Sequence, residues 1–251
     1  MSHKSFFESK NPLLSESKFI QTASVTTDQN SFIISDKATI SGAINKSFIL
    51  FSVLLFTSAI SFVMPSTFLM ICGVVGGLIA VLVASFKPHT SPISAPVYAG
   101  FEGLFVGSIS AIFASMIDGI ILQAVGLTFG TLLTMLVIYK SNIIPVTEKL
   151  KSGIMMATGA VFFVYLISFI GSFFGFNIPY LHEGGVIGIG ISVVIIGIAS
   201  LNLLLDFDQF EKAEQHGAPK YMEWFCALGL MVTLVWLYIE FLRLLSKLNR
   251  E

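Results

Sequence analysis

Two acidic residues inside long apolar stretches are the residues of this chain best placed to do chemistry. Asp206 lies at the end of one apolar run, within residues 202–209, and Glu240 lies inside the next run, within residues 236–243. A carboxylate at bilayer depth is costly, so it is expected to hold a proton, bind a cation or face a water-filled cavity. The pair therefore points to a proton or cation pathway.

Each of these acids also has a simpler interpretation. Asp206 could mark the cytosolic membrane interface, because the charged residues Asp208, Glu211 and Lys212 follow at once. Glu240 could form an i,i+3 pair with Arg243, with both side chains extending to an interface. Asp208 is expected to be solvated. The residues alone leave both interpretations open.

Helix geometry limits which acids can meet. If the last run starts at Trp224, Glu240 follows sixteen residues later, about 24 Å along a helix and most of a ~30 Å hydrocarbon core. Asp206 would then lie near the opposite face. Contact requires that residues 223–232 are kinked, peripheral or re-entrant. Glu223 is the geometrically easier partner for Asp206.

Glu102 is the third candidate. It lies eight residues into its apolar run, about 12 Å deep. No charged residue occurs within fourteen positions on either side of it. Gly103 and Gly107 follow with the spacing of small residues that pack helices closely. A lone acid at this depth indicates a functional rather than a structural role.

The elements that carry these acids are transmembrane helices. The 251 residues are 55% hydrophobic and 12% charged, with a mean hydropathy of +0.86, which predicts an integral membrane protein. Seven runs of spanning length predict an all-α, polytopic bundle. The predicted spans are about 47–64, 67–86, 94–117, 119–139, 153–174, 185–206 and 223–245.

The rest of the chain excludes several classes of function. Residues 1–46 are polar and are expected to form a mostly disordered cytosolic tail. The loops are too short for a soluble catalytic domain, and the histidines lack metal-ligand spacing, so no enzyme or cofactor is predicted. A net charge of −1 gives no basic field for nucleic acid.

Lysine positions predict the orientation. The tail and alternate loops hold the lysines, while the intervening loops hold none, so the N-terminus is expected in the cytoplasm. Seven full spans place the C-terminus outside, yet it carries Arg243, Lys247 and Arg250. Either the last segment is re-entrant, or the earlier loops outweigh these charges.

Two segments resemble the last two membrane segments of the Bax inhibitor family, which includes bacterial YccA-like proteins. They are Asn202-Leu-Leu-Leu-Asp206-Phe-Asp208-Gln and Leu237-Tyr-Ile-Glu240-Phe-Leu-Arg-Leu-Leu245, and the similarity covers roughly residues 45–248. The resemblance implies a seven-helix bundle in a bacterial inner membrane, with the last helix central. It also implies a pH-sensitive acid latch on a calcium leak, in which Asp206 and Glu240 match the paired acids and Glu102 matches an acid lining the path.

Two functions of different classes follow. The first is a proton-regulated cation leak, with Ca²⁺ as the expected ion and the latch and path drawn from Asp206, Glu240, Glu102, Glu223 and Asp208. Two close carboxylates cannot both ionise cheaply, so they would share a proton or recruit a cation. The alternative is a non-conducting interaction protein that restrains a membrane-bound protease through residues 1–46.

Overall fold

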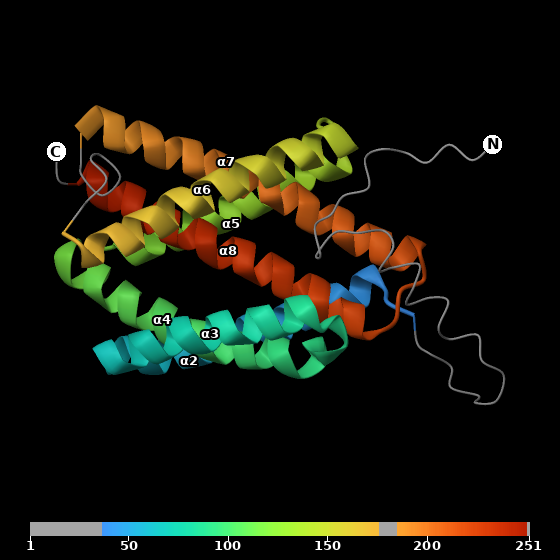
Figure 1. The fold of residues 1–251 in the computed structure, drawn as a ribbon, viewed down its shortest axis with the longest axis horizontal. Helices are drawn as coiled ribbons and strands as arrows, with labels where there is room; N and C mark the ends of the chain where they lie inside the picture. The colour runs from blue at the N-terminus through green and yellow to red at the C-terminus, as the bar shows by residue number, and fades with distance from the viewer. Residues whose placement is uncertain (1–36, 176–184, 250–251) are drawn as a thin grey trace.

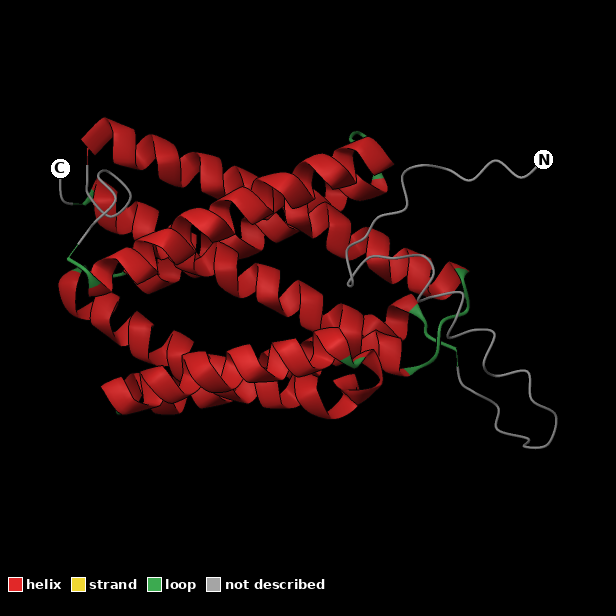
Figure 2. Ribbon diagram, in the orientation of Figure 1, coloured by secondary structure: helices red, strands yellow, loops and turns green. Residues whose placement is uncertain are grey.

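The chain folds as a bundle of long helices (Figures 1 and 2). The structure is a computed structural model that describes residues 37–175 and 185–249. The 3₁₀ turn η1 (Pro88–Thr90) precedes α4, and seven helices are long and apolar enough to cross a membrane. They are α2 (Ile40–Val63), α3 (Thr67–Phe86), α4 (Ser91–Met116), α5 (Ile120–Lys140), α6 (Glu148–Phe173), α7 (Gly185–Gln215) and α8 (Tyr221–Leu248).

Helix α8 forms the centre of the bundle. In its most apolar stretch 72% of the residues are buried, against 17–39% in the other six spans. It packs against α2, α4, α5 and α7, and Figure 1 shows it crossing between the helices on either side. Helix α8 is unbroken from Tyr221 to Leu248, so the last segment has the length and the composition of a full span.

Close helix contacts hold α2, α3 and α4 together. Gly103 and Gly107 of α4 face α2, where a Cβ would overlap the backbone carbonyl oxygens of Leu54 and Ser58 respectively. Gly73 of α3 faces α4, and a Cβ there would lie 2.6 Å from the Phe105 amide nitrogen. The Gly-xxx-Gly pair therefore serves close packing between backbones, as its spacing indicates.

Helix α2 begins earlier than the sequence suggested. It starts at Ile40, so residues 40–46 belong to the bundle and not to a tail. Thr39 caps the helix by accepting a hydrogen bond from the Gly42 amide at 3.0 Å. Residue Ala38 is buried, and its amide donates to the Ala218 carbonyl at 2.7 Å. The predicted tail before residue 37 lies outside the described residues.

Replacing Gly107 with alanine should destabilise the bundle, because the new Cβ would overlap the Ser58 carbonyl oxygen. Overpacking of this kind costs roughly 1–3 kcal/mol. The Gly107→Ala protein should therefore unfold at a lower temperature in the same detergent. The control is Gly100→Ala on the same helix, where nothing lies within 4 Å of the added Cβ. An equal fall in both variants would contradict close packing at Gly107.

Candidate functional site

Asp206 lies in α7 against the middle helix α8. Its side chain is 7% exposed, and its Oδ1 would lie 3.5 Å from a Cβ placed on Gly229 of α8. Thr233, one turn further along α8, lines the same cavity as Asp206, and its hydroxyl donates to the Gly229 carbonyl at 3.2 Å. The other oxygen, Oδ2, is buried and has no hydrogen-bond partner among the described residues. Asp206 is thus a buried acid with one oxygen left for a proton or a ligand.

Asp206 lines a cavity of about 470 Å³ between α3, α6, α7 and α8. Asn202, one turn before it, donates to the Thr158 hydroxyl of α6 at 2.8 Å and to the Ile198 carbonyl at 2.9 Å. The other polar side chains on its walls are Ser85, Gln209 and Thr233. Among the described residues, no lysine, arginine or histidine lines this cavity, and Asp206 is the one ionisable group on its walls. We call it the Asp206 cavity.

Glu240 lies deeper along α8 and is 1% exposed. Its Oε1 accepts hydrogen bonds from the Tyr165 hydroxyl of α6 and from Arg243 Nη1, each at 2.9 Å. The guanidinium of Arg243 also lies 4.9 Å from the centre of the Tyr165 ring. The predicted i,i+3 pair exists, but it is anchored inside the bundle. Glu240 Oε2 is buried and unpartnered among the described residues.

Asp206 and Glu240 are far apart. Gly229 faces Asp206, and Glu240 comes eleven residues later on the unbroken helix α8, about 16 Å along its axis. No hydrogen bond or ion pair joins them in the described part of the chain. The bend in the last span that their contact requires is absent, so the two acids do not form the pair that the resemblance implies.

Glu223 does not take the place of the second acid either. It is 3% exposed, and its Oε1 accepts hydrogen bonds from the amide and the hydroxyl of Thr39, each at 3.1 Å. Glu214 accepts from the next amide, Ile40, at 3.1 Å. These carboxylates satisfy amides at the start of α2, where a helix dipole favours negative charge. Glu223 is therefore an anchor for α2.

Glu102 lies between α4 and α3. Its Oε2 approaches Gly77 of α3, where a Cβ would be only 2.7 Å away. The half-buried side chain makes no hydrogen bond to a described residue. Gly77, Val81 and Ser85 share one face of α3 at i,i+4 spacing, and the last two line the Asp206 cavity. Glu102 and Asp206 therefore border the same helix face at different levels.

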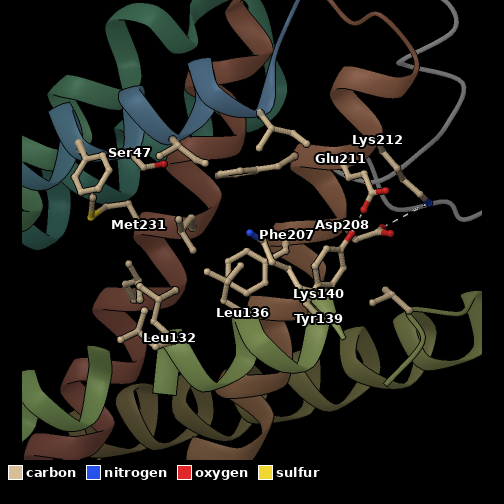
Figure 3. Close-up of a pocket in the computed structure, with 18 of the residues that line it drawn as sticks. Ser47, Leu132, Leu136, Tyr139, Lys140, Phe207, Asp208, Glu211, Lys212 and Met231 are labelled. Atoms are coloured by element: carbon tan, nitrogen blue, oxygen red, sulfur yellow. Dashed lines mark hydrogen bonds and ion pairs between the residues drawn. The ribbon is translucent and has the colours of Figure 1, made fainter. Parts of the chain in front are cut away.

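Asp208 belongs to an ion cluster at the end of the bundle where α2 begins. Its Oδ2 lies 2.8 Å from Lys151 Nζ and 3.6 Å from Lys212 Nζ, and Glu148 contacts both lysines. Asp208 also lines a second cavity of about 780 Å³. There Glu211 accepts a hydrogen bond from Tyr139 (Figure 3). The acids of this second cavity already have partners.

Sequence reasoning missed two side chains that join helices. Tyr165 links α6 to Glu240 through its hydroxyl. A tyrosine hydroxyl within the apolar run of α6 is the feature of the sequence that could have indicated this contact. Lys247, treated as a charge of the C-terminal tail, is 6% exposed. Its Nζ donates to the Gly188 carbonyl and the Ser192 hydroxyl of α7, each at 2.9 Å. The basic end of α8 is thus partly used for packing against α7.

The separation of Asp206 and Glu240 can be tested by asking whether substitutions at the two acids change the stability of the protein independently. Sites more than about 7–10 Å apart with no shared partner change stability additively, to within roughly 0.5 kcal/mol. The fall in unfolding temperature of the double variant Asp206→Asn with Glu240→Gln should therefore equal the sum of the falls measured for the two single variants. The control is the double variant Glu240→Gln with Tyr165→Phe. Its fall in unfolding temperature should be smaller than the sum of the two single variants, because these side chains share a hydrogen bond. Non-additivity in the first pair would refute the separation.

Comparison with known proteins identifies a family for the chain. No curated protein and no solved structure matches this chain. The model of the family described as "Bax inhibitor 1 like" matches residues 11–250, which includes every described helix. The chain is therefore a multi-pass membrane protein that belongs to the Bax inhibitor 1 like family.

Proposed function

We propose that this protein is a proton-regulated cation leak in which Asp206 is the gate. The observation that carries the proposal is the state of that carboxyl group. It is buried against the central helix α8 and, among the described residues, one of its oxygens lacks a partner and no cationic side chain lines its cavity. A carboxylate in such a place needs a proton or a cation, because lipid supplies neither hydrogen bonds nor charge.

The mechanism follows from the two protonation states of Asp206. A protonated carboxyl is neutral, and it is tolerated against Gly229 in the closed bundle. Loss of the proton leaves a buried charge whose cost is relieved if water or a cation enters the cavity. Deprotonation therefore favours the open, hydrated state. This gate uses a single acid, whereas the sequence suggested a proton shared by two.

Two other acids in the spans, Glu102 and Glu240, suit a path for a hard cation. Glu102 borders the α3 face that continues into the Asp206 cavity. Glu240 lies towards the opposite end of α8 and keeps one unpartnered oxygen. Calcium binds carboxylate and carbonyl oxygens with flexible geometry, so separate acids at successive depths favour it as the passing ion. In this account the protein acts as a leak and not as an enzyme.

The orientation completes the proposal. The ion cluster and the start of α2 lie at the end of the bundle where the lysines gather, and lysine-rich loops favour the cytoplasmic side. Asp206 then responds to the proton concentration on the cytoplasmic side of a bacterial inner membrane.

The proposal is tested by calcium flux into liposomes that hold the purified full chain, measured over a pH series. Wild-type flux should rise as the pH rises, because Asp206 loses its proton. Flux through Asp206→Asn should stay low and independent of pH, since the amide cannot ionise.

The matched control is Asp118→Asn, an acid-to-amide change at an exposed residue in the α4–α5 turn. Its flux should follow the wild-type pH profile. A pH-dependent flux in Asp206→Asn that equals the wild type, in protein shown to be folded by its unfolding temperature, would reject Asp206 as the gate.

A further inference from the structure

We propose that the Asp206 cavity is a bilayer-facing binding site for a lipophilic amine, with the ammonium group of the ligand paired to the Asp206 carboxylate. The inference uses the same acid as the proposed function, but it does not depend on ion conduction. It rests on three features of the cavity: where it opens, which charge it holds, and what the rest of its wall is made of.

The cavity opens sideways, towards lipid. Two of its walls come from α3 and α6, and these two helices do not pack extensively against each other: α3 packs against α4, and α6 packs against α7. Phe162 on the α6 wall is 60% exposed, which is expected of a side chain that faces hydrocarbon. Figure 1 shows α3 and α6 on opposite sides of α8, and residues of α8 also line the cavity. A molecule dissolved in the bilayer can therefore enter between α3 and α6.

The charge of the cavity selects a cationic group. Asp206 is more than nine-tenths buried. Within the described ranges, its Oδ2 has no partner and no basic residue lines the cavity. A primary ammonium has three N–H donors. It can bond the carboxylate and the side-chain oxygens of Asn202 and Gln209, which line the same cavity. An ion pair with this many hydrogen bonds offsets the cost of burying both charges.

Entry needs no charged species in the lipid. The amine crosses the hydrocarbon in its neutral form. The carboxyl group of protonated Asp206 then transfers its proton to the nitrogen lone pair, which breaks the O–H bond and forms an N–H bond. The products are a carboxylate and an ammonium in contact, and no other reactant is required.

The remaining wall suits an alkyl chain. It is formed mostly by apolar side chains, including Val81, Met155, Leu205 and Val232. The second cavity provides an internal contrast. It is larger, at about 780 Å³, but Lys151 and Lys212 neutralise its Asp208, and Tyr139 binds its Glu211. It therefore has no free acid that selects an amine.

The test uses the full chain in lipid nanodiscs and a dodecylamine analogue with a photoreactive diazirine in its alkyl chain. Irradiation should label residues of α3, α6 and α8 that line the Asp206 cavity. Unlabelled dodecylamine should compete at a concentration at least about tenfold lower than dodecanol, because hydrogen bonds to a charged group are worth about 1.5–3 kcal/mol. Asp206→Asn should abolish this difference.

A second variant blocks the cavity without altering the acid. Gly159 lines the α6 wall, and nothing lies within 4 Å of a Cβ added there. Gly159→Leu should therefore fold, fill the cavity and reduce labelling by at least about tenfold, as expected when the ion pair cannot form. The controls are Gly153→Leu, at an equally open and exposed position of α6 outside the cavity, and Asp118→Asn. Both should label as the wild type does.

Equal competition by dodecylamine and dodecanol would overturn the inference. So would labelling that neither Asp206→Asn nor Gly159→Leu alters, or labels confined to the second cavity. Labelling is read without an ion gradient, so its failure is distinct from a failure of the pH-dependent calcium flux.

Discussion

A helix in the middle of a membrane bundle must find a partner within the protein for every polar side chain that it meets, because lipid offers none. Helix α8 is that central helix, and its burial determines how the other helices are arranged around it. Most polar groups along it obey the constraint. Tyr238 bonds to Ser110 of α4 at 2.7 Å, and Lys247 bonds to α7. The exceptions are therefore informative.

The buried side-chain oxygens that break this constraint, in the described part of the chain, belong to Asp206 and Glu240. They differ in what surrounds them. Glu240 is held by Arg243 and Tyr165, so its charge is largely compensated where it lies. Asp206 faces a cavity without a base. The same geometry explains both proposals, because a proton, a calcium ion and an ammonium group all satisfy that carboxyl.

The fold follows largely from hydropathy, since seven apolar runs match seven helices and Gly103 and Gly107 indicate close packing. Which acids lie close together could not be predicted from the sequence. Asp206 and Glu240 were linked by resemblance, while their separation depends on the straight course of α8. Helix geometry made Glu223 the easier partner for Asp206, yet Glu223 binds the start of α2. That contact joins residues 184 positions apart, and no local pattern in the chain indicates it.

The proposed gate requires that the Asp206 carboxyl group holds a proton in the closed bundle. Infrared difference spectroscopy measures this directly, through the C=O stretch of a protonated carboxyl group in protein labelled with ¹³C-aspartate. A protonated-carboxyl band should be present in the non-conducting state. Asp206→Asn should remove this band, and its intensity should fall as the pH is raised. If Asp206→Asn leaves the spectrum of the closed, non-conducting protein without any loss of such a band, Asp206 does not hold the proton and the proposed gate is contradicted.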